Sequence, residues 1–101
     1  MQYGLPDGVI TKLVMLLSSD PRLEHITLYG SRALGNYRPG SDIDLCLDAA
    51  TMGLQDLFAL ETRIDDLLLP WKVDITVRQY IDNPALLEHI NRAGVELYPH
   101  V

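Results

Sequence analysis

The chain has 101 residues, 48% of them hydrophobic, and this length fits one compact domain over residues 1–101. Its 14 acidic and 8 basic residues give a net charge of −6, which argues against extended nucleic acid as a substrate. There is no apolar run of membrane-spanning length and no signal-peptide pattern, and the single cysteine cannot form an internal disulfide. A soluble cytoplasmic protein is therefore expected.

The periodicity of the apolar residues predicts helices that alternate with strands. The first half holds a helix that Asp7 can cap, a strand over 26–29, a short helical segment over 32–34 and a strand over 42–48. The second half holds a helix from Leu54 that Pro70 closes, a strand over 73–77, a helix capped by Asn83, and a strand or extended tail over 95–98. This order predicts an α/β fold, a small mixed β-sheet with helices packed on it.

The turn after the first strand has the features of a phosphate-binding site. Gly30 lets the backbone approach a ligand closely, and the N–H groups that begin the next helical segment are unpaired. The Ser31 hydroxyl can add a hydrogen bond, and Arg32 or Arg38 can neutralise a triphosphate. For Gly30 and Ser31 alone, a simple turn followed by a helix cap is the stronger alternative.

Ten residues separate Ser31 from Asp42, and one residue separates Asp42 from Asp44. Residues two apart on a strand share one face with their Cα atoms roughly 6.6 Å apart, so both carboxylates can reach shared metal ions. Mg²⁺ suits them because it takes oxygen ligands and is commonly bound by one or two carboxylates together with substrate phosphates. Two ions would hold the attacking and leaving oxygens of an in-line displacement. The alternative is an edge strand with solvated aspartates, and Asp48, farther along this face, is expected to be solvated.

Pro39 and Gly40 predict a type II turn over residues 38–41, which leads into the second strand.

Asp74 is the one acidic residue of the third predicted strand, whose other side is apolar. If this strand neighbours the second, Asp74 joins Asp42 and Asp44 as a metal ligand or accepts the proton of the nucleophile. Alternatively, Asp74 is a solvated edge residue or pairs with Lys72 or Arg78. The histidines have no metal-site spacing, so His89 is expected to pack or to lie at the surface.

The spacing Gly-Ser, ten residues, Asp-x-Asp and a later strand aspartate resembles the DNA polymerase β nucleotidyltransferase superfamily. The short chain is also similar to the minimal nucleotidyltransferases that are encoded beside a helical partner, which is either a HEPN-type protein or a substrate-binding protein. The resemblance implies a polymerase β-type core with catalytic, Mg²⁺-binding carboxylates at Asp42, Asp44 and Asp74. The nucleotide-binding residues that it implies are Gly30, Ser31, Arg32, Arg38 and Ser41.

The reaction implied by this resemblance is attack on the α-phosphate of ATP, with release of pyrophosphate and transfer of AMP to an acceptor. In antitoxin relatives the acceptor is a tyrosine of the HEPN toxin, so a type VII toxin–antitoxin pair is the leading hypothesis. One alternative is a non-catalytic subunit that neutralises its helical partner by contact. Another is transfer to a small molecule, with the partner supplying the substrate pocket. The sequence identifies neither the acceptor nor the base, the number of nucleotides transferred or the stoichiometry.

Overall fold

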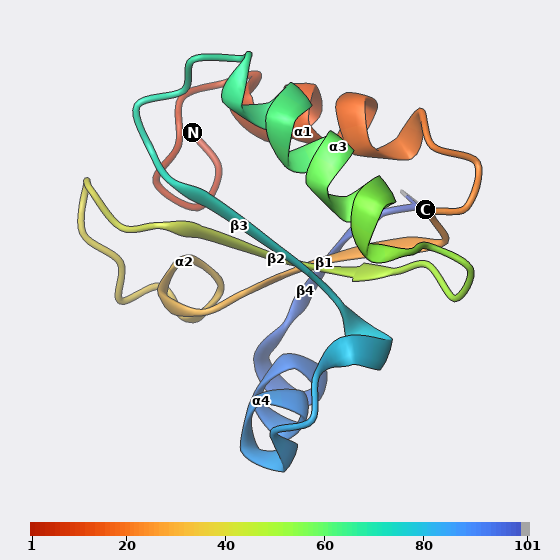
Figure 1. Cartoon of the computed structure of the whole chain (residues 1–101). Helices are drawn as coiled ribbons and strands as arrows, with labels where there is room; N and C mark the ends of the chain where they lie inside the picture. Colours follow the sequence, from red (N-terminus) through yellow and green to blue (C-terminus); the bar gives the residue numbers. More distant parts are fainter. Residues whose placement is uncertain (100–101) are drawn as a thin grey trace.

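A computed structural model describes residues 1–99 (Figure 1). The helices are α1 (Val9–Ser18), α2 (Ser31–Leu34), α3 (Leu54–Asp65) and α4 (Pro84–Ala93), with a 3₁₀ turn η1 (Arg78–Tyr80). The strands are β1 (His25–Tyr29), β2 (Ile43–Asp48), β3 (Val73–Val77) and β4 (Val95–Tyr98). The strands form a four-stranded mixed sheet in the order β3-β2-β1-β4, which confirms the predicted α/β fold. Within residues 1–99, none of the helices has the length and apolar character needed to cross a membrane.

Strand β2 lies inside the sheet, antiparallel to β1 and parallel to β3. Parallel strands need a long crossover, and α3 supplies it between β2 and β3. The register places Asp44 of β2 beside Tyr29 of β1 and beside Asp74 of β3. Three neighbouring strands therefore bring polar residues to the same end of the sheet.

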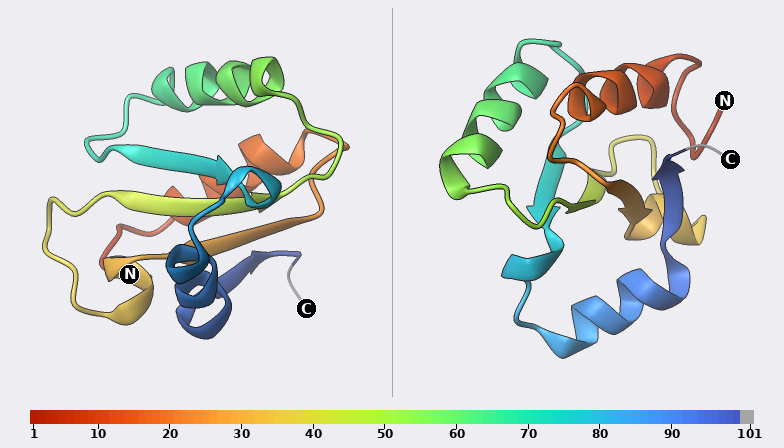
Figure 2. Two further views of the ribbon diagram at one scale, coloured as in Figure 1. Left: turned by 60° about the horizontal axis from the view of Figure 1, so that its bottom comes forward. Right: turned by 90° about the vertical axis from the view of Figure 1, so that its right-hand side faces the viewer.

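The two faces of the sheet differ in polarity. One face is apolar and packs under α1 and α3, whereas α4 lies on the opposite side (Figure 2). Strand residues buried in this core are Ile26, Leu28, Ile43, Leu45, Leu47, Ile75, Val77 and Leu97. Because side chains alternate along a strand, Asp44 projects away from the core formed by its neighbours on β2.

The sequence predicts one helix end correctly and two incorrectly. The Asn83 side chain accepts hydrogen bonds from the N–H groups at the start of α4, as expected for a cap. Helix α1 instead begins after Gly8 without a side-chain cap, because Asp7 lies 2.8 Å from the N-terminal ammonium group. Helix α3 ends at Asp65, well before Pro70, and Leu68 adopts a left-handed conformation with φ 53°.

The turn before β2 forms, with the Ser41 N–H donating to the Arg38 carbonyl at 3.0 Å. A type II turn needs a positive φ at its third residue, and Gly40 does not have one. The predicted turn type is therefore wrong, although its position is correct.

Candidate active site

The three aspartates lie where β2 and β3 begin. Asp44 and Asp74 are register partners on parallel strands, which lie about 4.8 Å apart, so their side chains leave the same face of the sheet. Both are partly buried, whereas Asp42, directly before β2, is exposed. The structure thus brings together the carboxylates that the sequence singled out.

Asp44 is the centre of this negative charge. Burial raises the pKa of Asp44 above its ordinary value, and the charges of Asp74 and Asp42 raise it further, against smaller opposing contributions from Lys72 and His89. The Lys72 Nζ atom lies 3.5 Å from Asp74 Oδ1, but the Lys72 side chain is 70% exposed and the Asp74 side chain 44% exposed, so this ion pair neutralises little. The carboxylates accordingly favour an additional cation.

The carboxylates of these aspartates suit Mg²⁺ as part of a ligand set that a nucleotide completes. Among residues 1–99, no three carboxylate, imidazole or thiolate groups converge as a preformed metal site. Mg²⁺ commonly needs only one or two carboxylates, because waters and substrate phosphates complete its ligand set. Asp44 and Asp74 are adjacent and share uncompensated negative charge. A metal held jointly by these aspartates and a nucleotide agrees with this arrangement.

Gly30 packs against the carboxylates at the end of β1. Its φ of 76° and ψ of −157° lie in a region that is essentially restricted to glycine. A Cβ atom at this position would overlap Asp44 Oδ2. The glycine therefore allows the turn that carries Ser31 to lie directly against Asp44.

The Gly30→Ala substitution should lower the free energy of unfolding by about 2–3 kcal/mol, because it adds backbone strain and displaces the Asp44 carboxylate. Urea unfolding measures the difference. Gly35→Ala is the matched control, since Gly35 also has a positive φ, 87°, but a Cβ atom there has no neighbour within 4 Å. Equal losses in the two variants would contradict the contact between Gly30 and Asp44.

His89 reaches this turn from α4, which the sequence did not predict. The Gly30 N–H donates to His89 Nε2 at 3.0 Å, and the His89 ring meets the Tyr29 ring edge-on at 6.2 Å between centroids. Burial, followed by the charges of Asp44, Cys46 and Asp74, raises the pKa of Tyr29 to about 12, so its phenol stays protonated. The contact joins residues 59 positions apart, so no local pattern announces it. One backbone donor of the expected phosphate site is thus paired with α4.

Arg32 lies elsewhere than the sequence suggested. Its side chain is 1% exposed and donates to the backbone carbonyls of Tyr3 at 2.9 Å, Pro39 at 3.2 Å and Ser41 at 2.9 Å. The Trp71 ring lies 5.9 Å from the guanidinium carbon, and the Trp71 Nε1–H donates to the Pro39 carbonyl at 2.9 Å. Arg32 therefore holds the loop that delivers Asp42 rather than presenting its charge to a nucleotide.

Ser41, Arg38 and Ser31 are the other residues whose side chains are predicted to bind the nucleotide. The Ser41 hydroxyl accepts a hydrogen bond from the Arg38 N–H at 2.8 Å, so it stabilises its own turn. The Arg38 side chain is exposed on that turn, and Ser31 is partly buried at the first position of α2. Of the predicted nucleotide-binding residues, Gly30 lies against Asp44, and Ser31 directly follows it in the chain.

Asp48 is not simply solvated, which corrects the expectation from the sequence. Arg78 Nε lies 2.6 Å from Asp48 Oδ1, and Arg78 Nη1 donates to Asn91 Oδ1 at 2.8 Å. This network joins β2 to η1 and α4. Arg78 is consequently engaged by Asp48, and the ion-pair partner of Asp74 is Lys72.

Comparison with known proteins gives a family match. Residues 11–100 match the family model described as polymerase beta, nucleotidyltransferase. A toxin–antitoxin structure with AMP-PNP is 26% identical, with a TM-score of 0.74 over 89% of this chain and 73% of that chain. A comparison with curated protein sequences found no match.

Two further toxin–antitoxin structures share the fold, each at 24% identity and over 88% of this chain. One is tri-AMPylated Shewanella oneidensis HEPN toxin in complex with MNT antitoxin, with a TM-score of 0.67 over 68% of that chain. The other is an MntA–HepT complex in which two aspartates with one residue between them are replaced by glutamate, with a TM-score of 0.73 over 72% of that chain.

Proposed function

The chain belongs to the polymerase beta nucleotidyltransferase family, and on that basis we propose that it transfers AMP from ATP to a hydroxyl group of a HEPN-type partner toxin. The observation that carries the proposal is the register of Asp44 with Asp74, directly beside the turn at Gly30. This arrangement combines paired carboxylates with a backbone turn at a glycine, and nucleotidyl transfer needs both.

The related complexes support the choice of ATP as the nucleotide and of a HEPN-type toxin as the partner. One contains AMP-PNP, an ATP analogue, and another holds an AMPylated HEPN toxin beside its MNT antitoxin. The aspartates replaced in the MntA–HepT variant have the same one-residue separation as Asp42 and Asp44. ATP as substrate and a tyrosine of the toxin as acceptor follow as the specific form of the proposal.

Each residue at the site then has a distinct task. The turn at Gly30 admits the triphosphate closely, and the Ser31 hydroxyl donates to it. Asp42, Asp44 and Asp74 would hold Mg²⁺, which supplies positive charge for the triphosphate. Asp74 lies next to Asp44 on β3, the edge strand of the sheet, where it can take the proton of an incoming acceptor hydroxyl.

The overall transfer forms a bond between the acceptor oxygen and the α-phosphorus of ATP. The bond from the α-phosphorus to the oxygen that bridges to the β-phosphate breaks, and pyrophosphate leaves with both bonding electrons. The proton of the acceptor hydroxyl passes to a carboxylate or to water. Pyrophosphate and AMP-modified partner are therefore formed in equal amounts.

The test is to incubate the purified chain with Mg²⁺, its HEPN-type partner and ATP labelled on either the α- or the γ-phosphate. Label from α-labelled ATP should enter the partner, and label from γ-labelled ATP should appear only in pyrophosphate. Mass spectrometry should then locate AMP on a tyrosine, and chelation of the metal should stop the reaction. If the two proteins form a complex and the toxin is neutralised without any transfer, neutralisation by contact replaces this proposal.

A further inference from the structure

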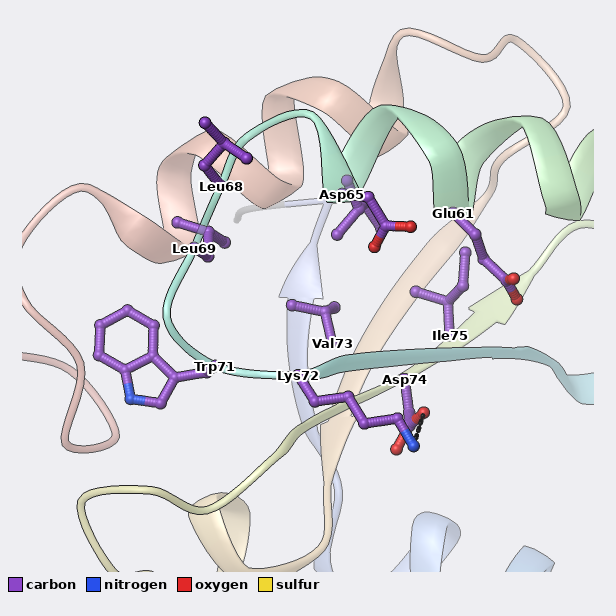
Figure 3. Close-up of a pocket in the computed structure, with 10 residues that line it drawn as sticks. Glu61, Asp65, Leu68, Leu69, Trp71, Lys72, Val73, Asp74 and Ile75 are labelled. Carbon is purple, nitrogen blue, oxygen red and sulfur yellow. Dashed lines mark ion pairs between the residues drawn. The ribbon is translucent and has the colours of Figure 1, made fainter.

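A cavity of about 380 Å³ opens between β3 and α3, close to the carboxylates (Figure 3). Leu68, Leu69 and Trp71 form its apolar end, and Lys72 and Asp74 form the other. Asp74 thus belongs both to this cavity and to the catalytic carboxylates. In Figure 3 the Asp74 side chain leaves β3 on the side away from α3, so a segment that lies along β3 can reach both the cavity and the place where the nucleotidyl group is transferred.

The backbone beside the cavity is also open. Strand β3 is at the end of the sheet and pairs only with β2 among the described strands. The Lys72 carbonyl accepts a hydrogen bond from the Ile43 N–H at 2.9 Å, so it faces β2. Groups alternate along a strand, and the N–H and C=O of Val73 and Ile75 consequently point to the free edge. Such an edge can pair with an extended segment of another protein.

Leu68 is unusual for a residue that serves only folding. It is 87% exposed and has a φ of 53°, a conformation that suits glycine or asparagine much better than leucine. Neither burial nor backbone preference explains a leucine at this position. Its apolar side chain at the rim of the cavity is better explained by contact with another molecule.

The cavity also has a definite charge preference. Glu61 and Asp65, both on α3, also line it. Neither takes part in an ion pair among residues 1–99, unlike Asp20, Asp48 and Asp56. Together with the net charge of −6, these carboxylates favour a basic residue on the bound molecule.

We propose that this cavity and the free edge of β3 are the docking site for the acceptor segment of the partner protein. The segment lies extended along β3, places an aliphatic or aromatic side chain against Leu68 and Trp71, and directs a lysine or arginine to Glu61 and Asp65. Its reactive hydroxyl then lies at Asp74. This inference rests on the proposed function and adds the route by which the acceptor reaches the nucleotide.

Two substitutions test the docking site without disturbing the fold. Leu68→Asn removes the apolar contact and places a residue that tolerates the left-handed conformation. Asp65→Lys reverses a charge at the C-terminal end of α3, where a cation is favourable for the helix dipole. We expect each variant to raise both the dissociation constant and the KM for the partner at least about tenfold, and to leave the KM for ATP unchanged.

The chain offers a matched control for each variant. Asp66→Lys makes the same change in net charge one residue further on, but Asp66 does not line the cavity. Met15→Gln removes another exposed apolar side chain, 68% exposed on α1 and outside the cavity. Both controls should remain within about twofold of the unsubstituted protein in partner binding, because only long-range charge or general surface hydrophobicity changes.

Partner binding is measured by calorimetry without nucleotide, and transfer is measured separately. Equal effects of Asp65→Lys and Asp66→Lys, or unchanged partner affinity in both cavity variants, would overturn the docking site. If the cavity variants weaken binding as expected but the unsubstituted protein transfers no AMP, the docking site stands and the proposed reaction fails. If transfer occurs and the cavity variants retain normal partner KM, the reaction stands and the docking site fails.

Discussion

Asp44→Asn should reduce AMP transfer by at least about 10²–10³-fold and at the same time make the folded protein more stable at neutral pH. The loss of transfer follows from removing the carboxylate at the centre of the site. The gain in stability follows because burial, together with Asp74 and Asp42, disfavours the ionised form of Asp44 and raises its pKa. A neutral amide removes this unfavourable charge. Transfer assays and thermal unfolding of the same preparations measure both effects.

The raised pKa of Asp44 also determines how the stability of the folded protein changes with pH. Because the pKa of Asp44 is higher in the folded than in the unfolded state, the folded state binds more protons between the two values. The contribution of Asp44 is therefore most favourable below the unfolded pKa, and stability is lost as the pH rises through the folded pKa. As the pH rises from the unfolded to the folded pKa of Asp44, the difference in Tm between Asp44→Asn and the unsubstituted protein should grow. Above the folded pKa this difference should stay constant.

Asp20 supplies a control of opposite sign. Hydrogen bonds from Arg22 lower the pKa of Asp20, with a 2.7 Å contact between Arg22 Nη2 and Asp20 Oδ2. Its stabilising contribution is present above the unfolded pKa and is lost as the pH falls through the folded pKa. Asp20→Asn should therefore lower the Tm at neutral pH and leave transfer nearly unchanged. An Asp44→Asn protein that is less stable at neutral pH, or that transfers AMP normally, would contradict the arrangement of the carboxylates.

Arg32→Ala should lower the free energy of unfolding by about 3–5 kcal/mol, which corresponds to a fall in Tm of at least about 12 °C for a domain of this size. The buried guanidinium donates to the carbonyls of Tyr3, Pro39 and Ser41. Alanine removes these donors and the packing of the loop, and it leaves the Pro39 carbonyl with the Trp71 Nε1–H donor alone. Arg32→Lys should recover only part of the loss, because a single ammonium group lacks the forked geometry of the guanidinium. Urea unfolding provides the measurement.

Arg38→Ala is the matched control for Arg32, because both arginines serve the same loop but the Arg38 side chain is exposed. Its free energy of unfolding should change by less than about 0.5 kcal/mol. If Arg38 binds the triphosphate directly, the Arg38→Ala protein should have a raised KM for ATP. An Arg32→Ala protein with normal stability and a raised KM for ATP would mean that Arg32 binds the nucleotide after all.

Features that depend on local chain geometry were predictable. The alternation of apolar residues indicated the strands, and Asn83 before Pro84 indicated the start of α4, because caps involve only the neighbouring backbone. Local predictions failed at two helix ends, and a nearby competing contact decided the first of them. Asp7 binds the N-terminal ammonium group instead of capping α1, and α3 stops at Asp65 although its apolar pattern continues toward Pro70.

The sequence by itself determined the motif of the site, since the spacing of Ser31, Asp42 and Asp44 is a property of the chain alone. Only the tertiary structure decided that Asp74 lies beside Asp44, because the α3 crossover sets which strands become neighbours. It also decided that Arg32 holds a loop and that His89 contacts Gly30. These hydrogen bonds join residues up to 59 positions apart, and side-chain partners at such separations depend on packing rather than on any local pattern.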